Sequence, residues 1–456
     1  MGVAVSGWRL ARAVSTREQL GVVSGTALDV VLARRLQLGD PGGQMEAALN
    51  AFPLREIAQR IWDRYYIPGG KKDSAAFKSK PLPSATPSKA LTELTIVANF
   101  AEVWSAKQGH NGVVGVNLLE KIQVPTLACL YGAMLAGVDY VLMGAGIPRA
   151  IPGILCDFAE GRLARMPLAI TGGDAATMEL DPNDFVGGPL KRPVFLAIVS
   201  SASLAQVLAR KTQPPVDGFV VEGWTAGGHN APPRGALALN VDGEPIYGER
   251  DVPQMETFRE LGLPFWLAGG YGTAERLAEA LAEGAQGIQV GTAFAFCEES
   301  GILPELKEQA IARSRSGDVK VFTDPKASPT GFPFKVMQVP DSVSEAEVYD
   351  SRERVCDLGY LRELYRKTDG SIGYRCAGEP IDDYLAKGGE EAATVGRVCV
   401  CNGLAATIGI GQVRKGVSEP MLVTAGDDVC NVSRYLREGA SSYSADDVLD
   451  TILALR

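Results

Sequence analysis

Short apolar runs that end in glycine or in a polar residue recur along this chain. Nine of them read as strands, at residues 22–26, 95–98, 113–117, 140–143, 168–171, 194–199, 218–221, 265–268 and 287–290. Between the last two, residues 274–282 have apolar positions at helical spacing. Strands that alternate with helices indicate βα units and a parallel sheet. The pattern predicts an α/β fold, a (β/α)8 barrel, in which one of the nine runs is misassigned or peripheral.

Three of these runs lead into turns that contain glycine. The run 218–221 is followed by EGWTAGGH (222–229), the run 265–268 by GG (269–270), and the last run by GT (291–292). Glycine lets backbone N–H groups approach an anion closely, and barrels bind phosphate after their seventh and eighth strands. We therefore expect a phosphate to be held by Gly227, Gly228, Gly270, Gly291 and Thr292.

The chain contains only two histidines. His229 follows a glycine pair after a strand, at the barrel face where active sites lie, and its side chain titrates near neutral pH. The alternative is a histidine packed in the core. His110 precedes a strand and is interpreted as a loop residue, because the opposite face of a barrel serves stability. We predict that His229 is the catalytic acid–base residue.

Two other strand ends carry candidate binding groups. The amide of Asn117 could satisfy backbone groups at the strand end or pair with the donor and acceptor edge of a flat heteroaromatic ring. Gly144, Ala145 and Gly146 form a turn whose small side chains would also let such a ring lie against the backbone. Both sets are candidate cofactor contacts.

These motifs, with residues 115–118 and 143–148, resemble the nitronate monooxygenase (2-nitropropane dioxygenase) family of FMN-dependent barrels. That family includes flavin-dependent enoyl-acyl-carrier-protein reductases. Residues 7–26 and 133–140 look closest to the trans-acting enoyl reductases of polyunsaturated fatty acid and polyketide synthases. The resemblance covers about residues 7–340 and implies an FMN-binding TIM barrel. It further implies cofactor contacts from Ser24, Gly25 and Gly269, with Glu222 as a group that orients the site.

The resemblance leaves two activities open, because both need the same flavin and the same histidine. One is oxidation of a nitronate with dioxygen. The other is reduction of an enoyl thioester, with NAD(P)H as the electron donor and His229 or water supplying the proton. A third possibility is a non-catalytic flavin-binding assembly protein.

An insertion at about residues 40–93 interrupts the barrel pattern and is expected to cover part of the barrel mouth. Its exposed turns are predicted from proline and glycine. Lysines in and after the barrel could dock an acidic acyl carrier protein or could simply be a solvated surface. They are Lys71, Lys72, Lys78, Lys80, Lys326 and Lys335.

After about residue 340 the pattern changes, and residues 341–456 are expected to form a mainly helical extension. It contains Cys356, Cys376, Cys399 and Cys401. A zinc or iron–sulfur site is one interpretation, but the spacing departs from the usual ligand pairs. Small buried apolar residues are the other, and we expect no metal site.

The amino-acid composition excludes some classes of binding partner for this protein. The 456-residue chain is 46% hydrophobic and carries a net charge of −9, which argues against nucleic acid or an anionic membrane as a partner. Its apolar runs are shorter than the roughly 20 residues of a membrane span. Eight cysteines are too sparse for a disulfide scaffold. We expect a cytoplasmic enzyme with a small-molecule or acyl-thioester substrate, and the oligomeric state stays open.

Overall fold

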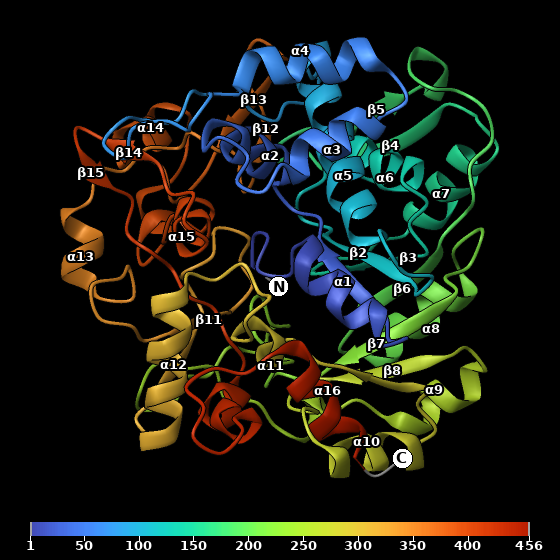
Figure 1. Cartoon of the computed structure of the whole chain (residues 1–456), viewed down its shortest axis with the longest axis vertical. Helices are drawn as coiled ribbons and strands as arrows, with labels where there is room; N and C mark the ends of the chain where they lie inside the picture. The colour runs from blue at the N-terminus through green and yellow to red at the C-terminus, as the bar shows by residue number, and fades with distance from the viewer. Residues whose placement is uncertain (1, 455–456) are drawn as a thin grey trace.

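The computed structural model describes residues 2–454 as an α/β fold built on one curled parallel sheet. Seven strands lie side by side in chain order: β1 (Gly21–Ser24), β2 (Val114–Leu119), β3 (Tyr140–Gly144), β6 (Val194–Val199), β7 (Gly218–Glu222), β8 (Phe265–Ala268) and β9 (Gly287–Gln289). Figure 1 shows β2 to β8 following one another down one side of the molecule. Parallel strands in sequential order define a (β/α) barrel, so the predicted fold class is confirmed.

Helices cover the outer face of this sheet. They include α5 (Lys89–Ala106), α6 (Thr126–Leu135), α7 (Ile151–Ala159), α8 (Ala202–Arg210), α9 (Met255–Leu261) and α10 (Ala274–Ala282). Val23, Val116 and Val141 face these helices and are completely buried. Because side chains alternate along a strand, Val22 and Leu142 face the barrel interior instead. With both faces covered, the strands are apolar throughout, which is why their sequence signal is strong.

The barrel has seven strands, not the eight predicted, and its edges stay apart. Within residues 2–454, β1 and β9 pair with no partner on their outer sides. Two terminal helices cover this gap: α1 (Trp8–Thr16) contacts β1, and α16 (Ala445–Leu453) contacts both α1 and α10. Figure 1 shows α1 and α16 side by side in front of the sheet. The two ends of the described chain therefore take the place of an eighth unit.

Two of the nine predicted strands are wrong. Residues 95–98 lie inside α5, which begins after Ser88, whose hydroxyl accepts the N–H of Leu91. This helix is buried on almost every side, so its apolar residues show no helical period. Residues 168–171 follow β4 (Ala164–Leu168), which pairs with β5 (Ala176–Leu180) in an antiparallel hairpin outside the main sheet.

The insertion does not cover the barrel mouth as predicted. Its helices α3 (Gln44–Ala51) and α4 (Arg55–Tyr65) pack on α5 and α2 (Leu28–Gln37), at the top of Figure 1. None of residues 40–93 lines the central cavity. The segment after α4 instead binds the C-terminal region, where the N–H of Phe77 donates to Gln412 Oε1 at 2.7 Å.

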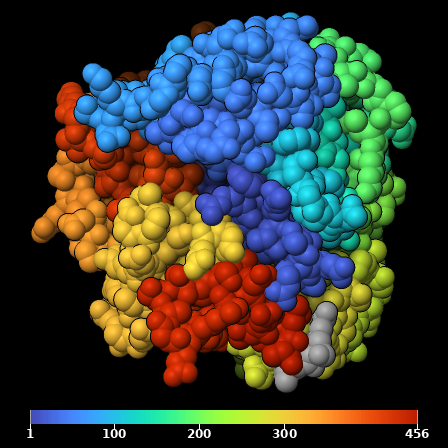
Figure 2. Space-filling model, in the orientation of Figure 1, coloured from blue at the N-terminus to red at the C-terminus, as the bar shows by residue number. Residues whose placement is uncertain are grey.

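Residues 341–454 form short helices and hairpins joined by irregular segments, and are less helical than expected. They contain α13 (Ala346–Ser351), β12 (Glu363–Arg366), β13 (Ile372–Arg375), α14 (Ile381–Ala386), α15 (Val400–Thr407), β14 (Val413–Arg414), β15 (Val417–Ser418), a 3-10 helix at Asp427–Tyr435, and α16. Before them come α11 (Thr292–Ala295), α12 (Pro304–Ser316) and the hairpin β10 (Val321–Asp324) and β11 (Phe334–Met337). Leu358, Leu404 and Leu422 belong to the same apolar core as the barrel strands. Figure 2 shows this region against α1 on one face of the molecule.

Candidate functional site

A cavity of about 630 Å³ occupies the barrel interior and its mouth at the carboxyl ends of the strands. Of the predicted site residues, the following line it: Ser24, Asn117, Gly144, Ala145, Gly146, Glu222, Gly227, Gly228, His229, Gly269, Gly270, Gly291 and Thr292. Gly25 does not line it. A Cβ at Gly25 would lie 2.6 Å from a methyl group of Val116, so this glycine allows close packing on β2. The role of Gly25 is therefore structural.

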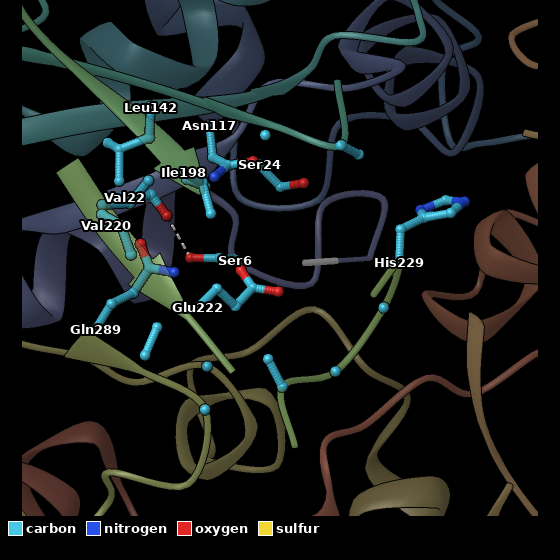
Figure 3. A pocket seen from close by; sticks show the side chains of 18 of the residues that line it. Ser6, Val22, Ser24, Asn117, Leu142, Ile198, Val220, Glu222, His229 and Gln289 are labelled. Carbon is cyan, nitrogen blue, oxygen red and sulfur yellow. Dashed lines mark hydrogen bonds between the residues drawn. The ribbon is translucent and has the colours of Figure 1, made fainter. Parts of the chain in front are cut away.

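Four polar side chains form one layer at the carboxyl ends of the strands, which we call the polar layer: Ser24, Asn117, Glu222 and Gln289. Each is the last inward-facing position of its strand that carries a polar group. Figure 3 shows them around one part of the cavity. Ser24 donates to the carbonyl of Gly2 at 2.7 Å, whereas the other three side chains have no hydrogen-bond partner among the described residues.

Gln289 was missed by the sequence reasoning, although a signal was present. It is a polar residue within the apolar run Ile288-Gln289-Val290, two positions after Gly287 and therefore on the same face of β9. Its amide has both donors and acceptors free to bind a ligand. We add it to the candidate site.

Glu222 is the carboxyl group of the polar layer. Burial raises the pKa of Glu222 from 4.5 to about 7, because a carboxylate loses solvation in the barrel interior. The side chain therefore changes its charge in the physiological pH range. Such a group in a cavity is a candidate for proton exchange or for setting the charge next to a bound ring.

His229 lies on the loop after β7, apart from the polar layer in Figure 3. Its Nε2 is 2.7 Å from Ser328 Oγ, which lies 2.9 Å from Thr330 Oγ1, and its ring packs edge-on against Phe334. Burial lowers the pKa of His229 to about 3, so the imidazole is neutral at pH 7. A neutral ring can accept a proton, and Ser328, which the sequence did not indicate, fixes its orientation.

The glycine turns after β8 and β9 have the geometry expected of an anion-binding site, and we refer to them as the anion cradle. Gly269 and Gly270 have φ of +97° and +77°, a backbone region that favours glycine. A Cβ at Gly291 would meet no atom within 4 Å, so the space in front of this residue is open. The N–H groups of Gly270, Gly291 and Thr292 have no acceptor within residues 2–454. These donors are free to bind a phosphate.

The glycine pair after β7 packs against the segment 424–426. The N–H of Gly228 donates to Thr424 Oγ1 at 3.0 Å, and a Cβ at Gly227 would lie 2.6 Å from the N atom of Gly426. Gly426 in turn donates to Thr292 Oγ1 at 2.9 Å. The N–H of Gly228 is therefore not free for phosphate, whereas the N–H of Gly227 has no acceptor among residues 2–454, so its contact with phosphate stays a prediction.

The donor groups fit an FMN. The cavity is large enough for a ligand of that size, the free N–H groups suit its phosphate, and the amides of Asn117 and Gln289 suit the polar edge of its ring. Gly144 also fits, since a Cβ there would lie 2.9 Å from Ile198, and its absence keeps the wall of the cavity flat. Gly146, with φ of +155°, continues this wall.

The other histidine is placed outside the site. Nε2 of His110 is 2.7 Å from the carbonyl of Ala106, and its Nδ1 accepts the N–H of Gly112 at 3.0 Å. These contacts cap the end of α5 and hold the turn before β2. The interpretation of His110 as a structural loop residue agrees with this geometry.

The four C-terminal cysteines, Cys356, Cys376, Cys399 and Cys401, line one small pocket beside the main cavity. They are free, and burial raises the pKa of the Cys399 and Cys401 thiols. Metals bind thiolates, not thiols. No group of three or more His, Cys, Asp or Glu residues that could hold a metal ion occurs in the described part of the chain. The zinc or iron–sulfur alternative gains no support from this geometry.

Two of the six lysines considered for carrier-protein docking are buried and therefore unsuited to it. Lys80 Nζ lies 2.8 Å from Asp29 Oδ2, and both side chains are at most 5% exposed. Lys335 Nζ lies 2.6 Å from Asp427 Oδ1 and is 4% exposed. Their acidic partners, Asp29 and Asp427, are far away in the sequence. The residues next to these two lysines therefore do not indicate that the lysines are buried in ion pairs.

The central part of the chain is similar to known proteins. Residues 177–331, which include His229 and the anion cradle, match the family described as nitronate monooxygenase. A probable nitronate monooxygenase of Bacillus subtilis (strain 168) is 32% identical over 148 residues, which is 32% of this chain and 40% of that protein. One of Staphylococcus saprophyticus is 31% identical over 142 residues, which is 31% of this chain and 38% of the relative. The chain thus spans well under half of the relatives' length.

The central part of the chain is thus similar to the nitronate monooxygenase family over about a third of its length. Among solved structures, it is similar to FabK from Thermotoga maritima, with a TM-score of 0.49 and 16% identity over 98% of this chain and 88% of that one. It is also similar to a nitroalkane oxidase from Streptomyces ansochromogenes, with a TM-score of 0.48 and 14% identity over 100% and 93% of the two chains. Because both TM-scores are below 0.5, the fold assignment rests on the parallel sheet itself and not on these similarities. Among the described helices, none is long and apolar enough to cross a membrane.

Proposed function

We propose that this protein is an FMN-dependent oxidoreductase that oxidises a nitronate. The observation that carries the proposal is the polar layer together with the free N–H groups of Gly270, Gly291 and Thr292. Glu222, Gln289 and these three N–H donors lie within residues 177–331, which match the family. Bound flavin would supply the electron acceptor, which this set of protein groups lacks. The protein binds the cofactor, orients the substrate and moves the proton.

Each group has a role in this proposal. The free N–H donors bind the phosphate, as helix and nest N–H groups do in other sites. Asn117 and Gln289 pair with the polar edge of the ring. Glu222 lies in the same layer and sets the charge beside that ring as it titrates.

His229 is proposed to accept the α-carbon proton when the substrate arrives as the neutral nitroalkane, which yields the nitronate that is then oxidised. Its ring is neutral at pH 7, so it can act as a base, and Ser328 holds one nitrogen. General acid–base help of this kind is worth about two to four orders of magnitude in rate. Glu222, another titratable group of the cavity, can be distinguished from His229 because the pKa values of the two groups are shifted in opposite directions.

A second candidate function is reduction of an enoyl thioester with electrons from NAD(P)H. The exposed lysines Lys72, Lys78 and Lys326 are the observation that favours it, since they could dock an acidic acyl carrier protein. The polar layer and the cradle would serve this reaction equally well.

Anaerobic mixing of the purified flavoprotein with one reactant at a time separates these functions. Bleaching of the visible flavin band by a nitronate alone supports the proposal, and bleaching by NADH or NADPH alone supports the reductase. A protein that retains flavin and reacts with neither class is the non-catalytic alternative. The Gly291→Leu variant, which should lose the cofactor, is the control for signal from free flavin.

A further inference from the structure

The gap between β1 and β9 is part of the main cavity. The cavity that holds the polar layer continues between these two strand edges to helices α1, α10 and α16. Leu10 and Val14 of α1, Leu277 of α10, and Leu449 and Ile452 of α16 line this part, which we call the seam channel. A closed eight-stranded barrel would have a strand in this position.

The seam channel is apolar. Every side chain that α1, α10 and α16 contribute to the cavity is aliphatic, whereas its charged residues lie on β7, on the loop after β7, and on the 3-10 helices Glu249–Asp251 and Asp427–Tyr435. Leu10, Leu277 and Ile452 are each at most 6% exposed. Their surfaces face an internal space that a charged or polar group could enter only at a large desolvation cost.

The channel also has a direction. One end opens beneath the polar layer, beside Ser24 and Gln289. The other end reaches Gln19 and Gln286, which precede β1 and β9 and therefore lie at the opposite face of the barrel. Gln286 is exposed, so the channel leads toward solvent. Along a four-residue strand this is a path of about 13 Å.

We infer that the seam channel binds an unbranched alkyl chain of the substrate, whose reacting end lies at the polar layer. The inference depends on the proposed function only for the chemical identity of the substrate's reacting end. The binding of the alkyl chain does not depend on it. A linear chain suits the channel because it is apolar along its whole length and has no charge to satisfy. The channel thereby selects substrates with a long tail over short or branched ones.

The test uses the holoenzyme and two readouts. The first is kcat/KM for the nitronates of 1-nitrobutane, 1-nitrohexane and 1-nitrodecane. The second is the Kd of butanoate and decanoate, measured by calorimetry, which needs no turnover. Burial of each methylene group should improve both quantities by about fourfold.

A pair of variants on one helix locates the effect. Leu277→Trp fills the channel and should abolish the dependence on chain length, while short substrates keep their kcat/KM. Leu281→Trp is the matched control, because Leu281 lies one turn further along α10, is 42% exposed and does not line the cavity. Ile452→Ala, which enlarges the channel, is the second variant and should make a branched tail acceptable.

The outcomes distinguish this inference from the proposed function. Tail-dependent decanoate binding that Leu277→Trp removes, without nitronate turnover, supports the channel and refutes the nitronate activity. Equal affinity for butanoate and decanoate refutes the channel, whatever the activity. Loss of flavin in Leu277→Trp and in Ile452→Ala would also refute it, since the cofactor and not an alkyl tail would then occupy this space.

Discussion

Replacing Glu222 with glutamine should stabilise the protein at neutral and alkaline pH. Glutamine keeps the shape of the side chain but carries no proton to lose. In the wild-type protein Glu222 is half-buried in the wall of the cavity, and its carboxyl group has no hydrogen-bond partner among the described residues. The fold therefore disfavours its ionised form, and that cost is what the substitution removes.

The size of the effect follows from the pKa. A rise from 4.5 to about 7 corresponds to about 3 kcal/mol, at about 1.4 kcal/mol for each pH unit. Below pH 4.5 the group is protonated in both states and costs nothing. Between pH 4.5 and 7 the unfolded chain loses its proton before the folded one, so the free energy of unfolding falls as the pH rises. Above about pH 7 the loss is complete.

Urea unfolding of flavin-free wild type and Glu222→Gln from pH 4 to pH 9 measures this. The two proteins should be equally stable near pH 4, and the variant should be more stable by up to about 3 kcal/mol above pH 7. Glu308→Gln, at an exposed position of α12, is the control and should show no such divergence. A constant difference between the two proteins across the pH range would refute the assigned burial of this carboxyl group.

Three further predictions concern the cradle, the base and the buried ion pair. Gly291→Leu should reduce bound flavin at least tenfold, measured by absorbance after gel filtration, because its side chain would fill the open space before the free N–H groups; normal flavin content would contradict the cradle. His229→Asn should keep its flavin and lose about 10²- to 10⁴-fold in turnover, whereas His110→Ala should keep full turnover and lose about 1 kcal/mol of stability; the reverse pattern would place the chemistry on the other histidine. Lys80→Met should cost about 3 to 5 kcal/mol in urea unfolding, because it leaves Asp29 buried and unpaired; a change under 1 kcal/mol would mean that water reaches this carboxylate.

The sequence predicted the elements whose signal is local. Strands β6, β7 and β8 are apolar runs closed by a turn, and the structure places them within one or two residues of the predicted ranges. The convergence of Asn117, Glu222 and Gly291 on one face follows from the rule that parallel strands end at the same edge of a barrel. Their placement at one cavity was therefore predictable, while their chemical roles stay predictions.

What the sequence could not predict depends on distant contacts or on complete burial. The run 95–98 looked like a strand because a helix buried on all sides loses its periodic pattern. Lys80 and Lys335 looked like surface charges because Asp29 and Asp427 are remote in the chain. The contact of Gly228 with Thr424 spans 196 residues, so nothing near either residue indicates it.

Because of that last contact, the proposed flavin site can be completed only late in synthesis of the chain. The barrel strands end at residue 289, but the wall behind the anion cradle is built from residues 424–426. A chain emerging from the ribosome can form its parallel sheet well before it can complete the cradle, since domains begin to fold from the N-terminal side. Retention of flavin at the proposed site therefore depends on residues near both ends of the described chain, and truncation before residue 424, which removes the wall of the cradle and also α16, should abolish cofactor affinity.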